Sequence, residues 1–321
     1  MINHGKNHLI GFALSLTAAA MWGILPIALK ELLVGMNAST IVWYRFLVAG
    51  LILFFWLSFR KELPNVFSTT RLIQLLLVIA ALGLCSNYYF FSDSLNYVNG
   101  ETSEAVIQLT TLFLILGGVV FYKEPFVGVQ KFGTFLIVCG LLLFFHDRLA
   151  EFADFQSNQT IGVFIVFLAA ITWTVYSLLQ KKLLERFSSP QILFLIYSFS
   201  AIILLPFISA NILLDLTSFE LGLLAFCCMN TLIAYGCFTE ALNCWEASKV
   251  SAVLALAPLF TIGGLRLIVY VSPTYAFTDR LSALSIIGAL LLVIGSVLTA
   301  LMPIFIQHVT DRKGNSHVGN N

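Results

Sequence analysis

Ten runs of about 20 apolar residues follow one another along the chain, and they limit the possible fold more than any other feature. A helix needs about 20 residues to cross the roughly 30 Å hydrocarbon core of a bilayer. The sequence is 59% hydrophobic and only 10% charged, which is too little charge for a water-exposed surface. We therefore predict an all-α membrane protein with ten transmembrane helices, at 9–29, 39–59, 72–97, 103–122, 126–145, 161–180, 190–210, 219–242, 248–271 and 281–306.

The positive charges are distributed unevenly over the connections between these spans. If the N-terminus is cytoplasmic, the cytoplasmic connections and tails carry twelve Lys and Arg residues, and the opposite side carries only Lys30, Arg148 and Arg280. Loops rich in Lys and Arg stay preferentially in the cytoplasm. We therefore predict that both termini are cytoplasmic and that the protein lies in the plasma (inner) membrane.

The second half of the sequence repeats landmarks of the first half in the same order. Trp22 recurs as Trp173 at an offset of 151 residues, and Tyr88 recurs as Tyr235 at an offset of 147. Each half holds five spans, an odd number, so the second copy enters the membrane upside down. This predicts two inverted five-helix repeats with the bounds 1–150 and 151–307, followed by a disordered cytoplasmic tail at 308–321.

Inverted repeats usually surround a substrate site near the bilayer midplane and permit alternating access. The organisation therefore favours a secondary transporter, with a membrane channel or a solute-sensing receptor as the alternative. The chain has no HExxH, GxSxG or Walker motif and no Cys/His metal spacing, so we expect neither an enzyme nor a metal or cofactor. A net charge of +1 gives no reason to expect nucleic-acid binding.

Several short motifs, taken in order, resemble the EamA-like branch of the drug/metabolite transporter superfamily. They include Ala-Ala-Met-Trp-Gly at 19–23, Arg45 early in the second span, Glu124 followed by Gly133 and Gly140, and Asp279-Arg280-Leu281 before Gly288. The resemblance covers about residues 9 to 305 and implies a ten-helix transporter that moves small metabolites or drugs, often outward, through a central cavity. The sequence departs from the family pattern at Thr111, which stands where the second half has Pro258.

Ionisable residues inside membrane spans are costly and are candidates for function. Asp93 and Glu240 are equivalent in the repeat and should lie near opposite membrane faces. We expect them to act in gating or in coupling to protons, although wetted helix ends or structural ion pairs would also explain them. The sequence leaves open whether protons are used at all.

Aromatic, amide and basic side chains within the spans are candidates for lining the cavity, because they combine stacking with hydrogen bonding. The same residues also suit helix packing or lipid contact, and Arg45 has the alternatives of reaching lipid headgroups or pairing with Glu104. We expect the cavity to include Trp22, Arg45, Tyr88, Tyr89, Gln108, Trp173, Tyr176, Asn230 and Tyr235.

These inferences together predict an exporter of a small organic metabolite or drug. Its partners would be the small-molecule substrate, the lipid bilayer and, if coupling exists, protons. The sequence does not identify the substrate or the oligomeric state, and it leaves import open as the alternative to the expected export.

Overall fold

The computed structural model describes residues 8–123, 126–209, 213–244 and 247–299, and these residues form helices and connections without any strand. Eight helical segments are long and apolar enough to span a membrane, and two shorter apolar helices occupy the places of the predicted fifth and tenth spans. The predicted tail at 308–321 and Glu124 lie outside the described residues. The eight long segments are Leu9–Leu32, Ala38–Arg60, Arg71–Ser94, Gly100–Tyr122, Asn158–Gln180, Ser189–Phe207, Ser218–Ala241 and Val250–Val271, and the two shorter helices are Gly128–Phe144 and Ala283–Thr299.

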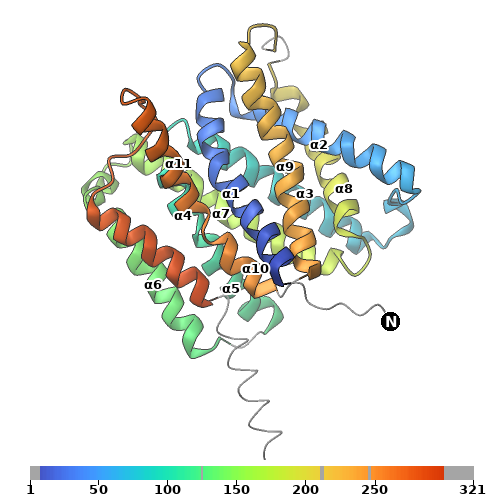
Figure 1. Cartoon of the computed structure of the whole chain (residues 1–321). Helices are drawn as coiled ribbons and strands as arrows, with labels where there is room; N and C mark the ends of the chain where they lie inside the picture. The colour runs from blue at the N-terminus through green and yellow to red at the C-terminus, as the bar shows by residue number, and fades with distance from the viewer. Residues whose placement is uncertain (1–7, 124–125, 210–212, 245–246, 300–321) are drawn as a thin grey trace, which may run out of the picture.

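The predicted spans agree with these helices to within a few residues at most ends, although two of the spans consist of two consecutive helices (Figure 1). Short 3-10 helices at Val66–Ser68, Leu149–Ala153 and Leu205–Phe207 lie in or beside the connections. The α-helices are α1 (His8–Leu32), α2 (Ala38–Arg60), α3 (Arg71–Ser94), α4 (Gly100–Ile107), α5 (Leu109–Tyr122), α6 (Gly128–Phe144), α7 (Asn158–Leu183), α8 (Ser189–Leu204), α9 (Ser218–Cys244), α10 (Ala247–Leu254) and α11 (Ala257–Val271), followed by the helix Ala283–Thr299.

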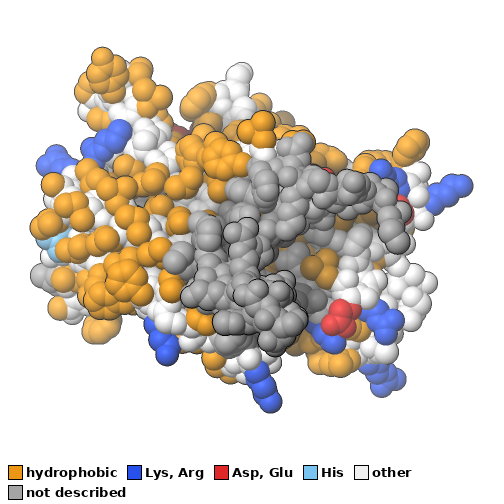
Figure 2. Space-filling view, turned by 60° about the horizontal axis from the view of Figure 1, so that its bottom comes forward, with side chains coloured by type: hydrophobic (Ala, Val, Ile, Leu, Met, Phe, Trp, Pro, Cys, Tyr) orange, Lys and Arg blue, Asp and Glu red, His pale blue; other side chains and the backbone are white. Residues whose placement is uncertain are grey.

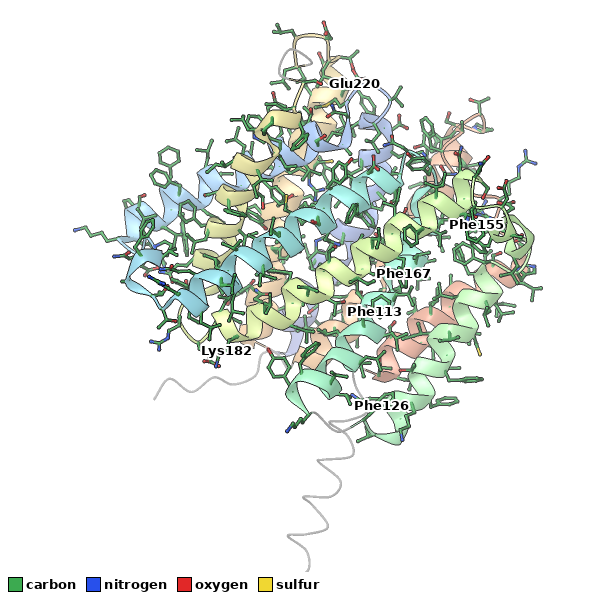
Figure 3. All side chains as sticks on the ribbon, turned by 180° about the vertical axis from the view of Figure 1, so that it is seen from behind. Phe113, Phe126, Phe155, Phe167, Lys182 and Glu220 are labelled. Atoms are coloured by element: carbon green, nitrogen blue, oxygen red, sulfur yellow. The ribbon has the colours of Figure 1, made fainter. Side chains whose placement is uncertain are left out.

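The bundle has two ends, which we name by the direction of α1. We call the end where α1 and α3 finish the distal face, and the end where α1 begins the proximal face. Figure 3 shows the two ends from behind, with Glu220 at the distal face and Lys182 at the proximal face. Polar caps fix several helix starts, for example Asn37, whose side chain accepts a 2.8 Å hydrogen bond from the backbone N–H of Thr40 at the start of α2.

The outer surface of the helices is strongly apolar. Figure 2 shows hydrophobic side chains over much of one face, with Lys and Arg mainly towards its margins. Phe121 is 74% exposed and Ile202 is 72% exposed. Such side chains would be unfavourable in water over so large an area, whereas lipid is as apolar as they are. The protein is therefore an integral membrane protein.

Helices from different halves of the sequence pack against each other in the centre. The helix α3 lies along α7, and α1 lies along α9. Asn87 of α3 donates a 2.9 Å hydrogen bond to the carbonyl of Ala169, and Asn230 of α9 donates a 2.6 Å hydrogen bond to the carbonyl of Met21. Interhelical amide bonds of this kind stabilise helix pairs where water is absent.

The predicted fourth and ninth spans are each interrupted about a third of the way along. The first break lies at Gln108, between α4 and α5, and the second lies at Ala255 and Leu256, between α10 and α11. The second break has an evident cause, because Pro258 has no backbone N–H to continue the helical hydrogen bonds. The first break forms without proline, since Thr111 occupies the equivalent position.

The helix α6 and the helix Ala283–Thr299 pack side by side through glycines (Figure 1). A Cβ atom added at Gly140 would lie 2.8 Å from the carbonyl oxygen of Gly288, and one added at Gly133 would lie 2.7 Å from the carbonyl oxygen of Gly295. The two backbones therefore touch directly. Small residues allow this close approach, which increases van der Waals contact between membrane helices.

Candidate substrate site

Five of the nine predicted cavity residues lie at one central cluster of aromatic side chains. Its buried members include Tyr88, Tyr176 and Tyr235, and Trp22 and Trp173 pack against them. The rings of Trp22 and Tyr235 make an edge contact with centroids 5.3 Å apart. We call this group, together with Phe46 and Tyr197, the aromatic cluster.

Phe46 of α2 links the tyrosines of the cluster. Its ring centroid lies 4.7 Å from that of Tyr88 and 5.3 Å from that of Tyr197, on which it stacks. The hydroxyl group of Tyr176 is buried and has no hydrogen-bond partner among the described residues. Buried hydroxyl groups normally find a partner, so this part of the interior is suited to water or to a polar ligand.

Arg45 joins the aromatic cluster from α2. Only 3% of the residue is exposed, and its Nε donates a 3.0 Å hydrogen bond to Oγ1 of Thr231, at the middle of α9. Its guanidinium carbon lies 4.4 Å from the centroid of the Tyr88 ring, a cation–π contact. The side chain thus reaches into the protein, not towards lipid headgroups, and it forms no ion pair with Glu104 or any other carboxylate that the structure describes.

Gln108 lies at the first helix break and faces the second one. Its Nε2 donates a 3.3 Å hydrogen bond to the carbonyl oxygen of Ala255. A break in a helix leaves carbonyl groups without their usual partners, and this amide satisfies one of them. The fourth and ninth spans therefore meet at their interruptions. Asn230, as described above, bonds to α1 and leaves its own Oδ1 without a partner among the described residues.

Tyr89 lies apart from the aromatic cluster, in a pocket of about 390 Å³ that opens at the distal face. Asp93 and Asn96 share this pocket, together with the connection between α1 and α2. Asn96 donates a 3.1 Å hydrogen bond to the half-buried carboxylate of Asp93. Glu240 is exposed near the proximal end of α9. The two predicted coupling residues therefore lie towards opposite faces.

A polar cluster that the sequence analysis did not anticipate closes part of the distal face. Asp279 accepts hydrogen bonds from Asn99 at 3.1 Å and from Thr102 at 2.6 Å, and Arg148 lies 3.5 Å from the same carboxylate. These residues join the connection after α11 to the start of α4 and to the connection after α6. We call them, together with Glu101 and Thr278, the distal network.

Glu101 fixes the same connection through a second carboxylate. Its Oε1 accepts a 2.6 Å hydrogen bond from Thr278 and a 3.2 Å hydrogen bond from the backbone N–H of Asp279. The residue is 1% exposed, and its Oε2 has no partner among the described residues. The sequence contained one signal for this network: the second half has eight more residues than the first before Asp279, which gives the connection enough length to fold back.

Lys30 supports the distal network, and Tyr275 lies in the same connection. Lys30, at the end of α1, donates hydrogen bonds to the carbonyl groups of Leu95 and Val98, the latter at 3.1 Å, and its ammonium lies 5.6 Å from the ring of Phe277. Burial and the nearby carboxylate of Glu31 raise the pKa of Tyr275 above its usual range, so its phenol stays neutral. The connection after α11 is therefore held at several points.

The described residues contain no group of three His, Cys, Asp or Glu residues placed to hold a metal ion. Comparison with known proteins then decides the family. The model of the EamA-like transporter family matches residues 9–146 and matches again at residues 160–301. The chain belongs to the EamA-like transporter family. It is a transporter of this family, not an enzyme.

Several proteins are similar to this EamA-like transporter over nearly their whole length. An "Uncharacterized transporter" of Haemophilus influenzae is 41% identical over 293 residues, which cover 91% of this chain and 95% of the relative. The "Uncharacterized inner membrane transporter YhbE" of Escherichia coli is 37% identical over 294 residues, covering 91% of each chain. A "Probable amino-acid metabolite efflux pump" of Escherichia coli is 23% identical over 297 residues, covering 88% of this chain and 92% of the relative.

A solved crystal structure also has this fold. It superimposes with a TM-score of 0.63 at 17% sequence identity, over 91% of this chain and 96% of the other. At this identity the likeness concerns the arrangement of the helices alone.

Proposed function

We propose that this protein is a secondary transporter that exports a small organic solute by alternating access between two inverted five-helix repeats. In this proposal α6 and the helix Ala283–Thr299 are the fifth and tenth transmembrane helices. The observation that carries it is the meeting of the two helix breaks, because Gln108 bonds to Ala255, the residue 147 positions later that is its own repeat equivalent. Transporters with inverted repeats commonly place their substrate site beside such interrupted helices.

Other contacts also recur at repeat-related positions. A Cβ atom at Gly117 would lie 2.5 Å from the side chain of Leu178, and a Cβ atom at Gly264 would lie 3.0 Å from the side chain of Ile27. Gly117 and Gly264 differ by 147 positions, and Ile27 and Leu178 differ by 151. The same contact between the two halves is thus made twice, at positions related by the proposed repeat.

The export direction and the membrane are part of the proposal. The relative named an efflux pump favours export, and the relative named an inner membrane transporter favours the inner membrane. The excess of Lys and Arg at the proximal face, such as Arg60, Lys61 and Arg186, favours a cytoplasmic location for that face and for both termini.

The proposal is tested by uptake and counterflow in proteoliposomes, with a library of amino acids, nucleosides and small amphiphiles, with and without an imposed pH gradient. We expect saturable flux of one class of solute and trans-stimulation by the same solute. Flux without saturation or counterflow would instead indicate a channel, and binding without flux would indicate a receptor.

Proton coupling makes a separate prediction for Asp93 and Glu240. If these carboxylates carry the coupled proton, Asp93→Asn and Glu240→Gln should abolish stimulation of flux by a pH gradient while leaving counterflow without a gradient. Exposed acids of each face, Asp147→Asn and Glu185→Gln, serve as controls and should leave the stimulation unchanged. Normal pH dependence in both test variants would exclude coupling through these residues.

A further inference from the structure

We propose that the solute carries a single carboxylate group, which the guanidinium of Arg45 binds at the aromatic cluster. This inference rests on the proposed transport function and specifies the class of its substrate. It follows from the charge of Arg45, from the chemistry of its neighbours and from the position of the distal pocket.

The positive charge of Arg45 is not balanced by any carboxylate that the structure describes. The residue is 3% exposed, and its partners there are the hydroxyl of Thr231 and the ring face of Tyr88, both of which are neutral. A charge removed from water in this way is costly unless an opposite charge accompanies it. The site is therefore electrostatically incomplete without an anion.

The geometry of Arg45 leaves the appropriate atoms available. Its hydrogen bond to Thr231 uses Nε, and the two Nη groups have no hydrogen-bond partner among the described residues. A guanidinium binds a carboxylate through two parallel N–H donors, a planar arrangement that lysine cannot reproduce. Thr231 and Tyr88 hold the plane of this guanidinium from two different helices.

The neighbours of Arg45 indicate which kind of anion fits. The cluster beside it consists of aromatic rings such as Phe46, Tyr88 and Tyr197, with the thiols of Cys227 and Cys228 nearby. One guanidinium balances one negative charge, so a monocarboxylate is compensated, whereas a doubly charged phosphate monoester is not. The rings provide stacking surface for an apolar or aromatic body attached to the carboxylate.

The distal pocket provides a short approach to Arg45. Ser39, at the start of α2, and Tyr89, which directly follows Tyr88, both line this pocket. Arg45 is six residues beyond Ser39 on the same helix, or about 9 Å along its axis.

The test compares matched acids and amides on the full-length protein. Thermal unfolding in detergent is followed with phenylacetate, L-phenylalanine and shorter monocarboxylates, each paired with its amide, and with inorganic phosphate. The same pairs are added to the counterflow library. We expect the fitting monocarboxylate to raise the unfolding temperature and to be carried at least about tenfold faster than its amide, the effect of one lost charged hydrogen-bond pair.

Three variants test whether this preference depends on Arg45. Arg45→Gln should abolish the difference between acid and amide, whereas Arg60→Gln should retain it. Arg60 is a matched control because it also belongs to α2 and also makes a cation–π contact, 4.8 Å from the ring of Trp56, but it is exposed. Arg45→Lys should retain only part of the preference for the acid over its amide.

A purely structural role for Arg45 predicts that Arg45→Met lowers the unfolding temperature measured without solute. In our proposal Arg45→Met removes an unbalanced buried charge. We therefore expect the unfolding temperature of this variant without solute to be unchanged or higher, and the shift by carboxylates to be lost. The inference is overturned if amides or phosphate act as well as acids, if Arg45→Gln keeps the preference, or if flux is confined to neutral or cationic solutes. In the last case transport itself still stands, whereas no flux of any solute would refute the proposed transport function.

Discussion

Gly288→Leu should prevent α6 and the helix Ala283–Thr299 from packing, and even Gly288→Ala should destabilise the protein. A Cβ atom at Gly288 would lie 2.5 Å from the backbone nitrogen of Phe144 and 2.6 Å from the carbonyl oxygen of Gly140. Both atoms belong to the backbone of a helix and cannot rotate away. We expect Gly288→Ala to cost about 1–3 kcal/mol of unfolding free energy and leucine to cost more.

The measurement is the unfolding temperature in detergent, together with the yield of monodisperse protein. Gly236→Ala is the matched control, because Gly236 is an exposed helical glycine with no atom within 4 Å of an added Cβ. Alanine is the better helix former, by about 1 kcal/mol, so this control should be neutral or slightly stabilising. Equal changes of the unfolding temperature in Gly288→Ala and Gly236→Ala would show that close backbone contact does not hold these helices together.

Asp279→Ala should release the connection after α11 from the start of α4. The carboxylate accepts hydrogen bonds from Asn99 and Thr102 and lies 3.5 Å from Arg148, in a pair whose side chains are 10% and 14% exposed. Without Asp279 the charge of Arg148 stays largely buried and unpaired. Removing one partner of such a pair costs about 3 kcal/mol, which we expect to appear as a lower unfolding temperature.

Limited proteolysis adds a local measurement to this prediction, since cleavage within residues 272–282 should become faster. Asp147→Asn is the control at the same face, because Asp147 is 38% exposed and lies 4.0 Å from His146. An exposed pair contributes only about 0–1 kcal/mol. If both variants unfold at the temperature of the unsubstituted protein, the distal network does not hold the connection.

The membrane class and the helix bounds follow from the sequence because a bilayer imposes one rule on every span. A run such as 39–59 has to satisfy its backbone within itself, so hydrophobicity alone locates the helix Ala38–Arg60. The aromatic cluster was also largely predictable, because Trp22 and Trp173, and likewise Tyr88 and Tyr235, recur at equivalent positions. Repetition identified these residues where polarity alone would not have done so.

Other features depend on contacts between distant segments and carry no local signal. The helix break at Gln108 contains no proline that would indicate it in the sequence. The side chain of Gln108 bonds instead to Ala255, which lies in the other half of the chain. Arg45 has the same sequence context whether it points to lipid headgroups or to Thr231. Glu101 and Asp279 are 178 residues apart, and nothing near either residue indicates that they meet.

The interlocked halves also have a consequence for biosynthesis. When the ribosome has completed about the first 150 residues, Asn87 and Arg45 are already in the membrane, but their partners Ala169 and Thr231 have not yet been made. The helix α6 meets its glycine partner only when Ala283–Thr299, the last described helix, has been inserted. A chain truncated near residue 150 leaves Asn87 and Arg45 without these partners, so interrupted translation there should yield a product that membrane proteases recognise and not a stable half-transporter.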